Sequence, residues 1–335
     1  MTLQPHDINL LVTNFPFKSA DVERLRAAVG VDALLATRSR QGLIEALTQH
    51  PETDVICVYS APDNLLKLAP HVGWVALSSA GAEHVVEQPW ARAPHAPIIT
   101  TANGVHAVPI SEHVFSGMLL WARRWPEMLE LQREHRWPEG SFYSNELVGR
   151  ELDGATLLIV GLGAIGRRVA TLGRAFGMRT LATRRSASSG ASDPDVDALY
   201  PMEQLDEALE QANYIVLAVP STPETQGLIN AERLAHARPG ALLVNIARGA
   251  VVDEPALLAA LREGRLGGAV LDVAAQEPLP PDSPLWTAPN VIISPHMSGR
   301  SVRYSERLTD LMLDNIARYR DGRPLRNVVE VARGY

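Results

Sequence analysis

The feature that most constrains the fold is a strict alternation of short apolar runs with segments of helical spacing. In the second half of the chain the apolar runs are ATLLIV (155–160), MRTLAT (178–183), YIVLAVP (214–220), ALLVNIA (241–247), GAVLDVA (268–274) and NVIISPH (290–296). Apolar strands that alternate with helices form parallel sheets covered on both faces. These six strands predict an open, doubly wound α/β sheet.

The N-terminal third repeats the pattern on a smaller scale. Its expected strands are 8–14, 32–38, 54–60, 72–79 and 96–103, and its clearest helices are 20–29 and 41–49. A chain of 335 residues is long enough for two domains. We therefore expect a second doubly wound unit with its own parallel sheet.

Three further segments lie outside these two sheets. A helix is predicted over 110–125, with Ser111 placed to cap its start. The polar, aromatic-dotted stretch 131–149 is typical of a surface excursion, and a long amphipathic helix is expected over 304–322. Because that last helix has no sheet of its own, we expect it to pack back on the first unit.

Composition excludes several classes of function. The net charge of −7 leaves no basic surface for a nucleic acid. The single cysteine, Cys57, excludes an internal disulfide and any cysteine-rich metal site, and its apolar neighbours predict a buried small side chain. No apolar run approaches 18 residues, and the N-terminus has no basic segment ahead of a long apolar one. We expect a cytoplasmic protein with no metal, membrane or nucleic acid partner.

The segment GLGAIG, Gly161 to Gly166, follows a predicted strand and opens a predicted helix. In a dinucleotide site Gly161 would allow the tight turn, Gly163 the approach of the pyrophosphate, and Gly166 close packing of helix on strand. Ala164 and Ile165 would then contribute N–H groups at the helix start. The alternative is a helix–strand corner that binds nothing.

The segment TRRS, Thr183 to Ser186, stands where NAD-binding units carry an acidic residue for the ribose hydroxyls. Here Arg184 and Arg185 occupy that place. A guanidinium group matches a phosphate in a bidentate fork, whereas an aspartate would repel it. The segment therefore predicts NADP, with NAD possible, against the alternative of two solvated arginines at a loop edge.

Charged and polar residues follow three successive predicted strands. Arg248 comes directly after 241–247, Asp272 and Glu277 end the next strand and its loop, and His296 ends the last one. Ligands of an open parallel sheet bind at the carboxyl ends of its strands, so these side chains would meet there. Each residue taken alone could have a structural role instead of a catalytic one, since a histidine beside a proline is more often structural.

Together the segments ELDGATLLIVGLGAIGRRVA, AVPSTPETQGLIN, ALLVNIARGAVVDEPAL, GAVLDVAAQEPLPPDSPLW and NVIISPH resemble the D-isomer-specific 2-hydroxyacid dehydrogenase family. The resemblance implies that Arg248, Glu277 and His296 are the catalytic residues and that Asp272 receives the nicotinamide carboxamide. It also implies a substrate-carboxylate loop at Ala80 and Gly81. The residues that would flank the cofactor are Val219, Pro220, Thr222, Ile246, Ala247, Arg248 and His296.

The chemistry of a 2-oxo acid reductase asks for the same roles. Hydride arrives at C2, and a histidine can protonate the developing alkoxide near neutral pH. A carboxylate would hold the imidazole in place. An arginine would fix the substrate carboxylate and polarise the carbonyl. This assigns proton transfer to His296, its support to Glu277, and substrate binding to Arg248 and His296.

The resemblance also implies a domain organisation. A Rossmann cofactor domain would span 103–298, and a flavodoxin-like, discontinuous substrate domain would combine 1–102 with 299–335. The active site is expected in the cleft between them. The helix at 110–125 and the region around Trp137 are candidates for a homodimer contact through the cofactor domain, with purely intramolecular packing as the alternative.

The predicted function is therefore NADP-preferring reduction of a small 2-oxo acid of the glyoxylate or hydroxypyruvate class. Two alternatives remain open. A phosphoglycerate-type dehydrogenase would need extra cations in the substrate domain, and the loop SSAGAEHV (78–85) has neither lysine nor arginine. A dinucleotide-sensing corepressor would not need the Arg248, Glu277 and His296 set. Tyr59, Ser60 and Trp286 are candidates for the wall of the substrate pocket.

Overall fold

The computed structural model describes residues 7–138 and 148–333. The chain divides into two compact units, Met1–His106 with Arg300–Tyr335, and Ala107–Gly299. These units lie close to the predicted domains, with the first boundary at His106 instead of residue 102. The functional roles assigned to the two domains remain predictions.

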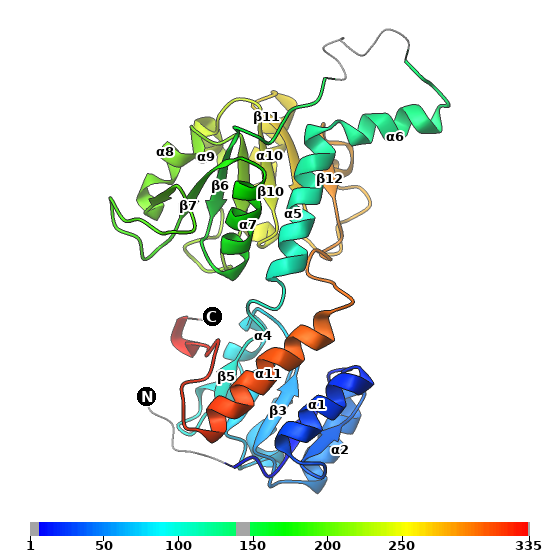
Figure 1. Cartoon of the computed structure of the whole chain (residues 1–335), viewed down its shortest axis with the longest axis vertical. Coiled ribbons are helices and arrows are strands. Elements are labelled where there is room, and N and C mark those ends of the chain that lie inside the picture. The colour runs from blue at the N-terminus through cyan, green and yellow to red at the C-terminus, as the bar shows by residue number, and fades with distance from the viewer. Residues whose placement is uncertain (1–6, 139–147, 334–335) are drawn as a thin grey trace. The chain divides into compact units, whose positions relative to one another are not determined.

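The first unit contains a five-stranded parallel sheet (Figure 1). Its strands are β1 (Leu11–Thr13), β2 (Leu34–Ala36), β3 (Val55–Val58), β4 (Trp74–Leu77) and β5 (Ile98–Thr100). They lie in the order β2-β1-β3-β4-β5, which is the flavodoxin-like order 2-1-3-4-5. All five strands fall inside the ranges predicted from their apolar runs.

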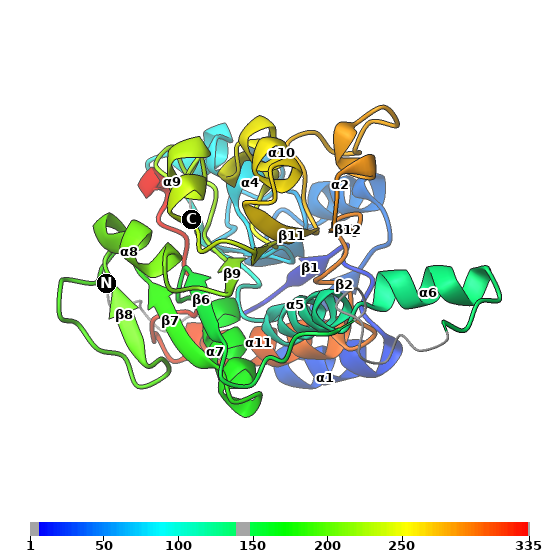
Figure 2. The same cartoon turned by 90° about the horizontal axis from the view of Figure 1, so that it is seen from above.

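The final helix packs on this unit, as expected from its lack of a sheet. Helix α11 (Tyr304–Arg320) lies beside α1 (Ser19–Val29), as Figure 2 shows. The Ser305 hydroxyl donates to Asp21 at 2.6 Å, and Arg24 pairs with Asp310 at 2.6 Å. The other elements of the unit are α2 (Arg40–Gln49), α3 (Leu65–Leu68), α4 (Glu83–Val86), η1 (Pro89–Arg92) and η6 (Val331–Arg333).

Cys57 lies in the centre of this sheet, on β3, and is fully buried. Burial raises the pKa of its thiol to about 12. The prediction of a buried small side chain at this position is confirmed.

The second unit contains a seven-stranded parallel sheet in the order β12-β11-β10-β9-β6-β7-β8. Its strands are β6 (Thr156–Val160), β7 (Arg179–Thr183), β8 (Ala198–Tyr200), β9 (Tyr214–Leu217), β10 (Ala241–Asn245), β11 (Leu266–Leu271) and β12 (Val291–Ile293). Numbered from β6, this is the Rossmann order 3-2-1-4-5-6 with a seventh strand at one edge. The prediction of six strands missed β8, whose three residues lie in the segment DVDALYP, where aspartates and a proline interrupt any longer apolar run.

Helices cover both faces of this sheet (Figures 1 and 2). The helices of this unit are α5 (Ala107–Ala122), α6 (Trp125–Arg133), α7 (Ala164–Ala175), η3 (Met202–Gln204), α8 (Leu205–Leu209), α9 (Ala231–His236), η4 (Gly249–Val251), α10 (Glu254–Arg262) and η5 (Pro284–Thr287). Helices α5 and α7 pack against one face, and α8, α9 and α10 against the other. Within the described ranges, no helix is both long and apolar enough to cross a membrane.

The start of α5 differs from its prediction. The helix begins at Ala107, and Ser111 lies inside it, fully buried, with its hydroxyl donating to the Val108 carbonyl at 2.9 Å. Pro109 lies in the first turn of the helix, where a proline is tolerated because the N–H groups there have no intrahelical partner. Of the expected excursion over 131–149, the first three residues belong to α6 and residues 139–147 lie outside the described part.

Candidate active site

The turn between β6 and α7 has the geometry that its three glycines predict. Gly161 has a φ of +105°, and a Cβ there would lie 2.7 Å from the Ala218 carbonyl oxygen. A Cβ on Gly166 would lie 2.3 Å from the Gly161 carbonyl oxygen. Both positions therefore require glycine for steric reasons. Gly163 differs, because it precedes the first turn of α7 and nothing lies within 4 Å of its Cβ position.

Open space at Gly163 leaves the backbone at the start of α7 accessible. Ala164 and Ile165 form the first turn of this helix, whose free N–H groups favour an anion. The turn thus has the shape expected of a pyrophosphate cradle.

The end of β7 carries two buried polar atoms without a hydrogen-bond partner among the described residues. They are the Thr183 hydroxyl oxygen and Nε of Arg184. Such atoms are rare in folded proteins, because an unpaired buried polar group costs about 1–3 kcal/mol. They lie one strand from the glycine turn, where the adenosine ribose of a bound dinucleotide would be expected. Arg185 and Ser186 follow and are exposed.

The remaining predicted cofactor residues lie at the same edge of the sheet. Val219, Pro220 and Thr222 follow β9, and Ile246 and Ala247 follow β10. Strands β9 and β10 continue the sheet outward from β6. Because all these strands are parallel, their carboxyl ends bring the predicted residues to one edge.

Arg248 lies in the turn after β10, and a buried asparagine holds that turn. The Asn245 side chain accepts from the Ala247 N–H at 3.0 Å and donates to the Arg248 carbonyl at 3.1 Å. At Gly249 a Cβ would lie 1.9 Å from the Ala274 carbonyl carbon, so the loops after β10 and β11 are in direct contact. This contact brings the segments that carry Arg248 and Glu277 together. Sequence reasoning missed Asn245, although an asparagine ending an apolar strand was a visible signal.

Glu277 and His296 form a close pair. Oε2 of Glu277 lies 2.6 Å from Nδ1 of His296, and Oε1 accepts from the Ala274 N–H at 3.1 Å. The carboxylate is thus fixed by its own loop while it orients the imidazole. His296 is 51 % exposed, and because Nδ1 faces Glu277, Nε2 is the nitrogen available for proton transfer.

Asp272 is almost fully buried and anchors the loop that carries His296. Its carboxylate accepts from the Ser294 hydroxyl at 2.6 Å, the Met297 N–H at 2.9 Å and the Ser298 N–H at 3.0 Å. Burial alone would raise the pKa of Asp272, but these hydrogen bonds outweigh it and the pKa lies below its usual value. Asp272 is therefore ionised at neutral pH. Its predicted contact with a carboxamide remains a prediction.

A histidine that sequence reasoning missed supports this anchor. Nε2 of His113, on α5, lies 3.0 Å from the Ser294 hydroxyl oxygen and 3.9 Å from Asp272. Because the single O–H of Ser294 donates to Asp272, the imidazole must donate to the Ser294 oxygen. Hydrogen bonds thereby connect His113 on α5 to Ser294 after β12, and Ser294 to Asp272 after β11.

Replacing Ser294 by alanine tests this network. We expect the free energy of unfolding to fall by about 1–3 kcal/mol, because Asp272 loses a donor and His113 loses its acceptor. Chemical denaturation measures the change. Ser116→Ala is the matched control, because its hydroxyl is exposed and bonds only within α5. Equal stability of the two variants would contradict the role given to Ser294.

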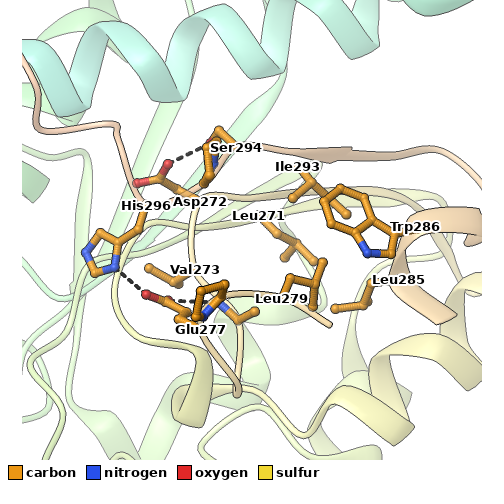
Figure 3. A pocket seen from close by; sticks show the side chains of 13 residues that line it. Leu271, Asp272, Val273, Glu277, Leu279, Leu285, Trp286, Ile293, Ser294 and His296 are labelled. Carbon is orange, nitrogen blue, oxygen red and sulfur yellow. Dashed lines mark hydrogen bonds and ion pairs between the residues drawn. The ribbon is translucent and has the colours of Figure 1, made fainter. Parts of the chain in front are cut away.

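A cavity of about 390 Å³ lies beside the Glu277–His296 pair (Figure 3). Its walls are mostly apolar, with Leu271, Val273, Leu279, Leu285, Trp286 and Ile293 among them. The Trp286 indole donates to the Pro280 carbonyl at 2.8 Å and forms one side of the space. Trp286 lies across the cavity from His296 (Figure 3).

The predicted substrate residues of the first unit follow its strands. Tyr59 and Ser60 follow β3, and the exposed Tyr59 ring stacks on His84 with centroids 4.8 Å apart. Ala80 and Gly81 lie in the turn after β4, where the Ser79 hydroxyl donates to the Gly81 carbonyl at 2.8 Å. Over the described ranges, no group of histidine, cysteine and acidic residues has the arrangement of a metal site.

Comparison with known families identifies this combination of fold and site. Residues 115–298 match the sequence model described as "D-isomer specific 2-hydroxyacid dehydrogenase, NAD binding domain". The chain belongs to the D-isomer specific 2-hydroxyacid dehydrogenases. The predicted family, the fold class and the assignment as an NAD(P)-dependent oxidoreductase of 2-hydroxy and 2-oxo acids are confirmed.

Relatives of this dehydrogenase have several names. It is 34% identical over 257 residues to a glyoxylate reductase of Pyrococcus furiosus, with 76% of this chain and 74% of that protein covered. It is 31% identical over 320 residues to a D-3-phosphoglycerate dehydrogenase of Synechocystis, covering 90% of this chain and only 54% of the relative. A solved structure of an NADPH-dependent glyoxylate/hydroxypyruvate reductase from Sinorhizobium meliloti, in complex with NADP and sulfate, matches with a TM-score of 0.78. That match has 27% identity and covers 98% of this chain and 100% of the other.

Proposed function

We propose that this dehydrogenase is an NADP-preferring reductase of a small 2-oxo acid of the glyoxylate or hydroxypyruvate class. The observation that carries the proposal is the Glu277–His296 pair, at 2.6 Å, at the sheet edge that also holds Arg248. In the same proposal Ala107–Gly299 is the cofactor domain, and the first unit binds substrate through Ala80 and Gly81.

The chain's own residues would carry all steps except the redox step. When bound, the reduced nicotinamide would supply a hydride to C2 of the 2-oxo acid. Nε2 of His296 donates a proton to the carbonyl oxygen, which becomes the hydroxyl. Glu277 keeps the imidazole oriented and balances the positive charge of its protonated form. The Arg248 guanidinium binds the substrate carboxylate and stabilises negative charge on the reacting oxygen.

The NADP preference is supported by the polar groups at the end of β7. A 2′-phosphate would accept hydrogen bonds from Arg184, whose Nε is buried without a partner among the described residues. The Thr183 hydroxyl, in the same condition, is a second donor for the ribose or its phosphate. The Sinorhizobium reductase, solved with NADP, supports the same preference.

Exchanging Arg184 for aspartate tests the preference. We expect the KM for NADPH to rise by about ten- to a hundredfold, because a charge-assisted hydrogen bond of roughly 1.5–3 kcal/mol is lost. The KM for NADH should change little or fall, since an aspartate can accept from ribose hydroxyls. Steady-state kinetics with both cofactors measure the effect, and equal changes in the two KM values would contradict contact between Arg184 and a phosphate.

A substrate panel tests the reaction itself. Purified protein is mixed with NADPH or NADH and with glyoxylate, hydroxypyruvate, pyruvate or 3-phosphohydroxypyruvate, and cofactor oxidation is followed at 340 nm. We expect the highest kcat/KM with glyoxylate or hydroxypyruvate. The greatest rate with the phosphorylated acid would favour the phosphoglycerate-type alternative. Binding of cofactor without turnover of any acid would favour the corepressor-like alternative.

A homodimer through the cofactor domain belongs to the same proposal. Helix α6 extends away from the sheet of its unit (Figure 1) and has no buried residue. Its Trp125, Met128 and Leu129 are exposed, as is Trp137 beyond it, and such grouped apolar side chains favour a protein partner. Light scattering after gel filtration should give twice the chain mass, and Met128→Glu with Leu129→Glu should reduce it to one chain.

A cytoplasmic location is proposed because the reaction needs a regenerated pool of nicotinamide cofactor, and cell fractionation tests it.

A further inference from the structure

The loop between β7 and β8 contains a buried carboxylate that contacts Arg184. Asp193 Oδ2 lies 3.3 Å from Nη1 of Arg184, and the Asp193 side chain is only 8% exposed. The loop is rich in serine, glycine and alanine, so few of its side chains can pack. The position of Arg184 therefore depends strongly on what holds Asp193.

Arg167, on the first turns of α7, holds Asp193 from the other side. Nη1 of Arg167 donates to Oδ1 of Asp193 at 2.9 Å, and Nη2 donates to Oδ2 at 2.8 Å. These hydrogen bonds lower the pKa of Asp193 to about 2, so the carboxylate is charged at neutral pH. The two short bonds to Arg167 have better geometry than the single longer contact with Arg184.

Asp193 acts on Arg184 in two opposing ways. Its contact restricts the orientation of the guanidinium, which favours binding of an anion by a prepared group. Its negative charge would repel a phosphate bound to that same guanidinium. The bidentate pairing with Arg167, which Asp195 also contacts, offsets part of this charge locally and leaves the orienting contact in place. The arrangement therefore keeps Arg184 oriented while it reduces the repulsion between Asp193 and a bound phosphate.

We propose that Arg167 and Asp193 are positioning residues that set the affinity of Arg184 for a ribose 2′-phosphate. Asp193 orients Arg184, and the guanidinium group of Arg167 offsets the negative charge of Asp193, which would otherwise repel the phosphate. The inference rests on the proposed NADP preference and extends it to two residues that need not touch the cofactor.

The signature of this arrangement is non-additivity. Arg167→Ala leaves the Asp193 charge without its main partner, so Asp193 turns to Arg184 and repels the phosphate. Asp193→Ala removes both the orientation and the repulsion. The double variant should therefore bind a 2′-phosphate better than Arg167→Ala alone, which independent contributions would not produce.

The probes are 2′-AMP, which carries the phosphate in question, and adenosine, which differs from it only by lacking that phosphate. Titration calorimetry on the full chain gives both dissociation constants. We expect Arg167→Ala to weaken 2′-AMP by about tenfold, and Asp193→Ala and the double variant by about threefold each. For adenosine all changes should stay below about twofold. Asp195→Ala is the matched control, because Asp195 lies in the same loop and pairs with Arg167 and Arg174. The affinity of this variant for 2′-AMP should stay within about twofold of that of the wild type.

Each outcome bears on a different statement. If wild-type protein binds 2′-AMP no more tightly than adenosine, both the NADP proposal and this inference are overturned. If wild-type protein prefers 2′-AMP but Arg167→Ala leaves that preference intact, or the double variant is weaker than Arg167→Ala, only the inference fails. Asp193→Asn covers the case in which Arg167→Ala does not fold, because it keeps the side-chain shape without the charge. A loss of 2′-AMP affinity above about tenfold in that variant also overturns the inference.

Discussion

Replacing His296 by glutamine should lower kcat for 2-oxo acid reduction by about 10²–10⁴-fold, the usual contribution of a general acid. Glutamine can still accept and donate hydrogen bonds near Glu277, so the loop anchored by Asp272 should persist. It cannot transfer a proton near neutral pH. Steady-state kinetics at saturating NADPH and substrate measure kcat, and quenching of tryptophan fluorescence measures cofactor binding. We expect the cofactor dissociation constant to change by less than about threefold.

The matched control is His236→Gln. His236 is an exposed histidine of the same unit, and its Nδ1 lies 3.0 Å from Glu210, so it reproduces a histidine–glutamate pair away from the site. Its kcat should equal that of the wild type. If His296→Gln kept more than a tenth of the wild-type kcat, His296 would not be the proton donor.

Arg248→Lys is expected to lower kcat/KM by about 10²–10³-fold, because one ammonium group cannot replace a planar, bidentate fork. The turn should remain folded, since Asn245 holds it through backbone groups. The loss should fall on the substrate and not on the cofactor. Kinetics with varied 2-oxo acid at saturating NADPH give the effect, and the KM for NADPH should stay within about threefold.

Arg262→Lys is the control for this change, because Arg262 is exposed near the end of α10. Its kcat/KM should match that of the wild type. A loss in Arg248→Lys confined to the KM for NADPH would assign Arg248 to the cofactor instead of the substrate carboxylate.

Sequence reasoning recovered most of the fold because the strands are long apolar runs bounded by turns. It failed at β8, which lies in the short run DVDALYP interrupted by aspartates, and at the start of α5, where Ser111 was taken as the cap of the helix. Both failures are local, and neither changes the order of the sheet. The flavodoxin-like and Rossmann strand orders agree with the strand–helix alternation that is visible in the sequence.

Some residues of the candidate site could be predicted from the sequence, and others could not. Arg248, Glu277 and His296 could be placed at one sheet edge from the sequence because each lies in a segment that follows a predicted strand, where a charged side chain has no packing role. His113 and Asp193 could not, since their partners lie far along the chain, whereas Asn245, which bonds to the nearby Ala247 and Arg248, was missed although it ends an apolar strand. His113 meets Ser294 only because α5 packs over the sheet, and Asp193 meets Arg167 only because its loop folds back on α7. Supporting residues of this kind are visible only in three dimensions.

The burial of Cys57 has a practical consequence. The chain's only thiol is fully buried with a pKa of about 12, so it is almost entirely protonated and unreactive toward alkylating dyes at neutral pH. A cysteine introduced at an exposed position, such as Ser192, would therefore be the single site of labelling without removing the native one. An environment-sensitive fluorophore at that position would report nucleotide binding beside Arg184 in a stopped-flow instrument, with no background signal from the rest of the chain.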